Sequence, residues 1–379
     1  MRLGVDAVLD RRLLRSSPHP IAVALSGGGD SLALVLIASD WARNAGRQLL
    51  VLTVDHRLRP ESGAWTQACA ATARRLDLPF RALAWTGEKP ATGLPAAARH
   101  ARHTLLADAA REAGARVILM GHTADDVLEA GLMRETGSTT PDPREWGPSP
   151  VWPQGRGLFL LRPLLGAQRG EIRDWLSARG ESWIDDPANA DTAYARPRAR
   201  TAVAQGAAPV TPTEVASAKA LALACQADND GGLDIGRADL RAADPEAAAR
   251  FLSAACLCAA GTDRPPARAK VDHLLARLAK TAPFVSTLAG ARIEAAGAGV
   301  RFLREPGEAA RGGLAPLRLA AGETGVWDGR FETTAARAVE VRAHPGSASP
   351  FFSADDTKVT PLAFDRLLAA CGAIEREPD

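Results

Sequence analysis

The chain has few of the features that mark secreted, membrane-spanning or metal-cluster proteins. Its five cysteines lie at irregular spacings and form no Cys-x-x-Cys pair, which argues against a disulfide framework and against a four-cysteine zinc site. No apolar run approaches the roughly 20 residues of a membrane span. The N-terminal stretch carries charges throughout and lacks the apolar segment of a signal peptide. We therefore expect a cytoplasmic protein with reduced thiols and no membrane contact.

A large excess of charge of one sign is also absent. The formal net charge is +2, so the overall balance does not single out a nucleic-acid binder, and any contact with RNA would need a local basic patch. The basic residues are mostly arginine. Arginine offers a planar fork of donors that suits phosphate, although a GC-rich genome explains the same bias equally well.

The order of strand and helix signals predicts the fold. A length of 379 residues favours two or three domains. From residue 21 to residue 133, continuous apolar strands alternate with helices, which predicts a doubly wound parallel α/β sheet covered on both faces. A helical region follows, and then short strands with glycine turns. We predict a catalytic domain at 1–205, a helical domain at 206–284 and a small α+β domain at 285–379.

A glycine-rich loop from Ser26 to Ser31 follows the first strand and opens a helix. Glycines let backbone N–H groups approach a polyanion, and the helix N-terminus adds unpaired donors. Asp30 among phosphates makes sense if it holds Mg²⁺. The loop lacks the lysine of a Walker A motif, and Leu32 stands where a dinucleotide fingerprint needs its third glycine. A plain strand-to-helix turn is the competing interpretation.

Further polar segments follow the other strands. Asp55 and His56 end the second strand, and Ser62 is a candidate helix cap. In the segment 98–103, Arg99, Arg102 and His103 share one helix face, which can be a binding face or merely a solvated one. In the segment 121–129, His122, Asp126 and Glu129 would also share a face if helical. Three ionisable groups there suggest ligand or metal binding, with helix capping as the alternative.

The order of these motifs resembles the tRNA(Ile)-lysidine synthases of the PP-loop ATP pyrophosphatase superfamily. The resemblance covers residues 20–200 and includes the segments 54–62, 162–165, 184–191 and 194–200. Three positions depart from the family pattern, namely His103 for tyrosine, Ala130 for threonine and Pro197 for asparagine. The segment after Arg134, normally rich in arginine and glycine, is here a proline-rich loop.

The resemblance implies an adenine nucleotide α-hydrolase-like fold and a two-step reaction. ATP would adenylate C2 of the wobble cytidine of a CAU-anticodon tRNA(Ile), and free L-lysine would then displace AMP to give lysidine. It implies Asp30, His122, Asp126 and Glu129 as catalytic residues and Arg102, Asp126 and Glu129 as lysine ligands. It implies Arg196 and Arg200 for phosphate or tRNA and Asp30 for Mg²⁺. The ATP-binding residues would be Ser26, Gly27, Gly28, Gly29, Asp30, Ser31, Asp55 and His56.

Other classes of protein stay open. A PP-loop tRNA thiolase would need reactive cysteines, and an amidating synthetase of small molecules would need an ammonia source. A module that only binds RNA would need no intact loop. Oligomeric state is open, a homodimer being one option.

Overall fold

The computed structural model describes residues 4–138, 143–185, 195–209, 217–307, 314–344, 350–352 and 357–378. The chain divides into two compact units. Unit 1 comprises Met1–Glu214 together with Glu375–Asp379, and unit 2 comprises Val215–Ile374. The three-domain division proposed from sequence stays a prediction. No helix among the described ranges is long and apolar enough to cross a membrane.

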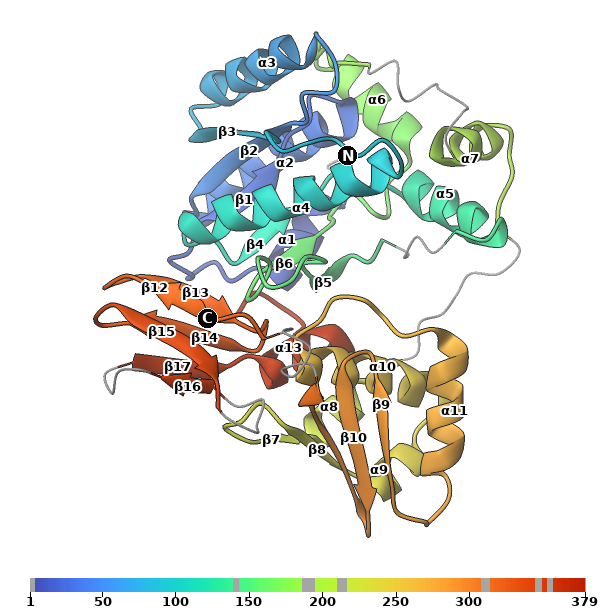
Figure 1. The fold of residues 1–379 in the computed structure, drawn as a ribbon. Coiled ribbons are helices and arrows are strands. Elements are labelled where there is room, and N and C mark those ends of the chain that lie inside the picture. Colours follow the sequence, from blue (N-terminus) through green and yellow to red (C-terminus); the bar gives the residue numbers. More distant parts are fainter. Residues whose placement is uncertain are drawn as a thin grey trace. The chain divides into compact units, whose positions relative to one another are not determined.

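Unit 1 is built on a six-stranded sheet (Figure 1). Its strands are β1 (Ile21–Ala24), β2 (Leu49–Asp55), β3 (Phe80–Ala84), β4 (Val117–Leu119), β5 (Trp146–Pro148) and β6 (Phe159–Leu161). The spatial order is β3-β2-β1-β4-β6-β5, and only β5 runs antiparallel to its neighbour. The predicted doubly wound parallel sheet is thus confirmed. The chain order reverses between β1 and β4, and ligands of such sheets bind beyond the carboxyl ends of the strands at that point.

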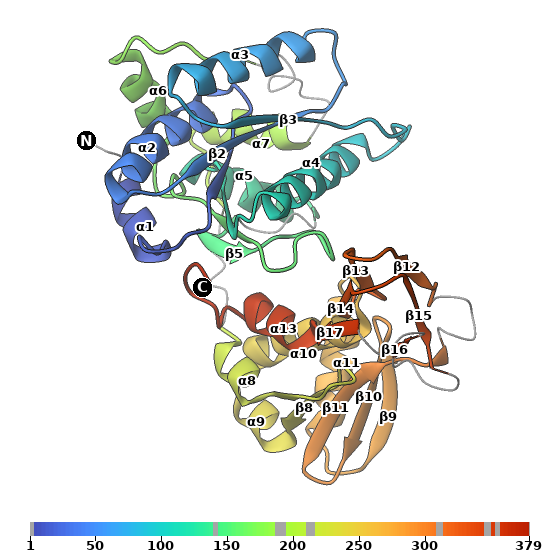
Figure 2. The ribbon, with the colours of Figure 1, turned by 90° about the vertical axis from the view of Figure 1, so that its left-hand side faces the viewer.

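Helices cover both faces of this sheet (Figures 1 and 2). The helices of unit 1 are α1 (Val5–Arg12), α2 (Gly29–Ala45), α3 (Ser62–Arg75), α4 (Leu94–Glu112), α5 (Ala124–Glu135), α6 (Arg169–Ser177) and α7 (Ala195–Ala204), of which α7 packs against α5. Successive strand residues point to opposite faces. Val23 and Val51 therefore pack into the core beneath α1, α2 and α6. Ala22 and Leu52 pack into the core beneath α4.

One local prediction for unit 1 is wrong. From the sequence alone we predict an irregular, arginine-rich segment over 187–200, but α7 begins at Ala195. Pro197 lies in the first turn of this helix, where a backbone N–H has no intrahelical partner and proline is therefore tolerated. The segment 186–194, which carries the Asp-Pro-x-Asn-x-Asp element, lies outside the described residues.

Unit 2 has a helical layer packed on an antiparallel sheet. The helices are α8 (Lys219–Ala224), α9 (Arg237–Ala242), α10 (Pro245–Ala260), α11 (Arg268–Leu278) and α13 (Ala363–Cys371). The sheet contains β7 (Gln226–Ala227), β8 (Leu233–Gly236), β9 (Phe284–Leu288), β10 (Ala291–Ala296) and β11 (Gly299–Arg304), in the order β7-β8-β11-β10-β9. Strands from both sides of residue 284 thus share this sheet. From the sequence alone we predict a helix over 213–227, but α8 ends at Ala224 and the chain is extended from Gln226.

The remaining strands of unit 2 form two small sheets. They are β12 (Leu317–Leu319), β13 (Thr324–Trp327), β14 (Phe331–Ala335), β15 (Val339–Ala343), β16 (Pro350–Phe352) and β17 (Thr357–Pro361). Asp328, in the turn between β13 and β14, accepts hydrogen bonds from Arg304 and Arg330, and all three side chains are buried. The segment 326–331 therefore contains a buried ion-paired turn within unit 2.

Candidate active site

The glycine-rich loop connects β1 to α2 at the carboxyl edge of the sheet. Gly28 is the N-cap of α2, and Gly27 has a φ of +87°, a conformation that favours glycine. The Ser31 hydroxyl donates to the Gly28 carbonyl at 2.9 Å and accepts from the Ser26 N–H at 3.2 Å. The loop is thereby held in shape from within, with the positive end of a 17-residue helix behind it.

Neighbouring segments press closely on this loop. A Cβ atom on Gly27 would lie 2.6 Å from Ile184 Cδ1, and one on Gly121 would lie 3.1 Å from the backbone of Asp30 and Ser31. The Ile184 N–H also donates to the Gly27 carbonyl at 3.0 Å. The loop is thus packed between the segment after β4 and the segment after α6, and Ile184 is a supporting residue that the sequence motifs did not single out.

The predicted acidic residues gather on the first turns of α5. His122, Asp126 and Glu129 are all buried, but α5 begins at Ala124, so His122 precedes the helix and does not share its face. The carboxylate of Asp126 has two functions. Its Oδ2 accepts from the Thr123 N–H at 2.7 Å and caps the helix, while Oδ1 faces two arginines. Capping and charge binding therefore coexist at this residue.

Arg169, at the first position of α6, joins the acidic residues into one network. Its guanidinium donates to Asp30 Oδ2 at 3.3 Å, to Glu129 Oε1 at 3.1 Å and to Asp126 Oδ1 at 3.3 Å. Its backbone N–H donates to Asp125 Oδ2 at 2.8 Å. Although burial opposes it, these carboxylates raise the pKa of Arg169. Sequence reasoning missed this residue, since no motif contains it.

Arg196 completes the network from α7. Its Nη2 donates to Asp126 Oδ1 at 2.6 Å and its Nε donates to Glu129 Oε2 at 3.1 Å. Burial tends to raise the pKa of Asp126, but Arg196 and His122 outweigh it and the pKa is lowered. Burial lowers the pKa of Arg200, and the Asp30 and Glu129 charges that oppose this lowering show that Arg200 lies near the same cluster. Arg196 is thus engaged with carboxylates, while Arg200 lies beside them.

A basic cluster borders the acidic one. Arg162, which follows β6, donates from Nε to His122 Nδ1 at 3.2 Å. Burial and the Arg162 charge lower the pKa of His122 to about 3, so this ring is neutral at physiological pH. Burial, aided by Arg99, lowers the pKa of Arg102 to about 10. Arg102 Nε and His103 Nε2 are buried without a hydrogen-bond partner among the described residues, which favours a ligand that brings negative charge or acceptors.

Asp55 and His56 lie where β2 ends. Asp55 Oδ1 accepts a hydrogen bond from the Arg57 N–H at 2.7 Å, which closes a tight turn. Arg57 in this turn has a φ of +52°. Burial and the charge of Arg102 lower the pKa of His56. The structure therefore places these two residues one strand from the glycine-rich loop, since β2 pairs with β1.

The ionisable residues at this edge fit a magnesium ion held partly by phosphate. No cluster of three or more metal-ligating side chains occurs in the described part of the chain. Mg²⁺ is commonly held by one or two carboxylates together with substrate phosphates. The Asp30 carboxylate, on the first turn of α2, matches that requirement, and burial raises its pKa.

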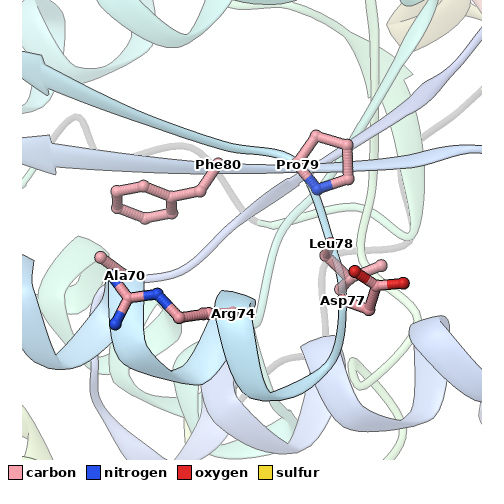
Figure 3. A pocket seen from close by; sticks show the side chains of 6 residues that line it. All are labelled: Ala70, Arg74, Asp77, Leu78, Pro79 and Phe80. Atoms are coloured by element: carbon pink, nitrogen blue, oxygen red, sulfur yellow. The ribbon is translucent and has the colours of Figure 1, made fainter.

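A surface hollow elsewhere in unit 1 lies apart from the glycine-rich loop and its charged neighbours. Figure 3 shows it between α3 and the start of β3, lined by Ala70, Arg74, Asp77, Leu78, Pro79 and Phe80. Phe80 begins β3, so the hollow lies at the amino end of that strand, whereas the motifs lie at the carboxyl ends.

The chain is similar to several known proteins. Residues 5–207 match the PP-loop domain family. The tRNA(Ile)-lysidine synthase of Caulobacter vibrioides is 50% identical over 365 residues, covering 96% of this chain and 86% of that protein. The enzyme of the same name from Rhizobium meliloti is 37% identical over 352 residues, covering 86% and 76%. A solved U34-tRNA thiolase from Methanococcus maripaludis overlaps 53% of this chain and 76% of its own, with 14% identity and a TM-score of 0.40.

Proposed function

We propose how the residues of unit 1 divide the work of one reaction, on the premise that the chain belongs to the tRNA(Ile)-lysidine synthases of the PP-loop family. It is a C–N ligase that forms lysidine in tRNA(Ile) and uses ATP. The observation that carries the residue assignment is the charge network at the carboxyl edge of the sheet, where Asp126 Oδ1 lies 2.6 Å from Arg196 and 3.3 Å from Arg169.

The first step is adenylation of the wobble cytidine at C2. The oxygen on C2 attacks the α-phosphorus of ATP, and pyrophosphate leaves. The backbone donors of the loop from Ser26 to Ser31 would bind the departing pyrophosphate. They would thereby stabilise the negative charge that develops on it in the transition state. Asp30 would hold Mg²⁺, which supplies further neutralisation of phosphate charge when bound. Asp55 and His56 would border the adenosine, since they end the neighbouring strand.

The role of His122 follows from its hydrogen bond. Arginine Nε can only donate, so the Arg162 contact at 3.2 Å makes His122 Nδ1 an acceptor and leaves the proton on Nε2. With its pKa near 3, His122 is a poor proton acceptor. We assign it to donating from Nε2 to the phosphate of the adenylate.

The second step is attack of the lysine side-chain amine on C2, with departure of AMP. Arg102 would bind the lysine carboxylate, since its Nε is buried and unpaired in the described structure. Asp126, with a lowered pKa, is suited to binding an ammonium group and not to taking its proton. Glu129, one turn further along α5, would then accept the proton that the amine loses before attack.

The other enzyme classes lack support in unit 1. A thiolase would need a reactive thiolate, but Cys69 is the one cysteine in this unit's sequence, and burial raises its pKa. The protein would act in the cytoplasm, with a CAU-anticodon tRNA(Ile) as its partner. Its recognition of that tRNA would include unit 2.

The variant Asp126→Asn tests the lysine site. We expect the KM for lysine to rise at least tenfold, while the KM for ATP changes by less than about threefold, because the phosphate loop is intact. Asp174→Asn, an exposed carboxylate on α6, is the matched control. Unchanged lysine incorporation by Asp126→Asn would show that the lysine ammonium binds elsewhere.

A further inference from the structure

Trp85 lies directly after β3, next to the predicted ATP-binding residue His56. Its backbone N–H donates to the Asp55 carbonyl at 2.9 Å, which ties it to the end of β2. The His56 ring meets the indole edge-on, with ring centroids 6.2 Å apart and planes at 87°. The indole is half-buried, so these contacts fix its plane without covering the whole ring. In Figure 2 the chain beyond β3 continues as a loop to the start of α4.

A lysine of the same loop covers one face of this indole. Lys89 Nζ lies 3.6 Å from the centre of the ring and donates to the Trp85 carbonyl at 2.7 Å. Partial desolvation and the charge of Arg57 lower the pKa of Lys89, while Asp55 raises it, so Arg57 also lies nearby. A half-exposed aromatic ring with a cation over its face is a composition with which proteins bind unstacked nucleotides.

The strength of the two competing contacts decides what can occupy the ring. An ammonium group over an exposed ring is held weakly, whereas a nucleobase stacked on an aromatic side chain is held more firmly. A base can therefore displace Lys89, whose ammonium is then free to meet the phosphate that accompanies the base.

We propose that Trp85 is a stacking platform for a nucleobase of the tRNA anticodon loop, covered by Lys89 when no RNA is bound. The proposal rests on the proposed function, which requires a cytidine outside the anticodon stack and beside ATP. The order of strands supports RNA over the adenine of ATP. The phosphate loop follows β1, His56 follows β2 and Trp85 follows β3, so Trp85 lies one strand further out than the nucleotide residues.

The variants Trp85→Ala and Trp85→Phe test the platform. Labelled-lysine incorporation is measured at varied tRNA and, separately, at varied ATP. We expect Trp85→Ala to raise the KM for tRNA about 5- to 50-fold, with the KM for ATP within twofold, and Trp85→Phe to recover most of the loss because it keeps a ring face. An effect on the KM for ATP in place of tRNA would assign the ring to adenine and overturn the proposal. Equal losses in both variants would also overturn it.

A second tryptophan under a cation provides the matched control. Arg179 lies 3.8 Å over the Trp175 ring, but Trp175 packs against the core on α6. Trp175→Ala should leave the KM for tRNA within twofold, and an equal rise would show that the Trp85 effect is a general loss of stability. Wild-type protein that makes no lysidine contradicts the proposed function itself. Active wild-type protein with a normal Trp85→Ala variant contradicts only the platform.

Discussion

Replacing Arg169 with methionine should destabilise unit 1 by about 3 kcal/mol. The Arg169 side chain is 11% exposed, and its guanidinium forms ion pairs with Asp30, Asp126 and Glu129. Removing one partner of a buried ion pair costs ~3–5 kcal/mol. We expect the lower end, because Arg196 stays on Asp126 and Glu129, and because the Asp30 side chain is 25% exposed and partly solvated. Arg169→Lys should recover only part of the loss, since an ammonium group cannot reach three carboxylates as a planar fork does.

Urea unfolding at neutral pH, followed by circular dichroism, measures this difference. Arg173→Met is the matched control, because Arg173 lies one turn further along α6, is 46% exposed and pairs with the exposed Asp185 at 3.7 Å. Such a surface pair contributes about 0–1 kcal/mol. If the losses in Arg169→Met and Arg173→Met were equal, Arg169 would not be the residue that holds the carboxylates together.

Three further outcomes follow from charge and close packing. Burial raises the pKa of Asp30 above its ordinary 3.8, so the ionised carboxylate lowers the stability of the folded state once the pH rises past that value. Asp30→Asn should therefore unfold at a higher urea concentration than wild type at pH 7, and this difference should vanish below about pH 4. The variant should also lose activity. Burial lowers the pKa of His103 from 6.5 to about 2, so the folded state binds fewer protons than the unfolded state and stability falls as the pH drops below about 6.5. Between pH 6.5 and 5, the free energy of unfolding of His103→Phe should therefore fall by about 1.5 kcal/mol less than that of wild type. Identical acid unfolding curves would refute the assignment. Gly121→Ala, whose Cβ meets backbone of the phosphate loop at 3.1 Å, should raise the KM for ATP on the order of tenfold, whereas Gly63→Ala, which meets open space, should leave it unchanged.

The sheet, the phosphate loop and the carboxylates of α5 could be predicted because short, local sequence patterns specify them. The apolar strands and their intervening helices indicated the sheet, and the position of Ser26 to Ser31 after β1 indicated the phosphate loop. The spacing of Asp126 and Glu129 placed both carboxylates on one helix, where the structure has them. Their roles in substrate binding stay predictions.

The partners of those carboxylates were not predictable. Asp30 and Arg169 are separated by 139 positions, and a pairing of that length depends on how α6 packs against α2, which no periodicity reports. Ile184 supports the loop through a backbone hydrogen bond to Gly27, a contact that requires no special side chain. The resemblance implied that Arg196 binds phosphate or tRNA, and it could not indicate that α7 places this arginine against Asp126.

The most direct test of the central claim is transfer of labelled lysine to RNA. Purified protein is incubated with ATP, Mg²⁺, labelled lysine and a tRNA(Ile) transcript bearing the CAU anticodon, with a second transcript carrying uridine at the wobble position as the control. The account predicts label in the first transcript, none in the second, and release of AMP and pyrophosphate in step with the label. Cleavage of ATP to AMP without label in the RNA would contradict the lysidine assignment while leaving PP-loop chemistry in place.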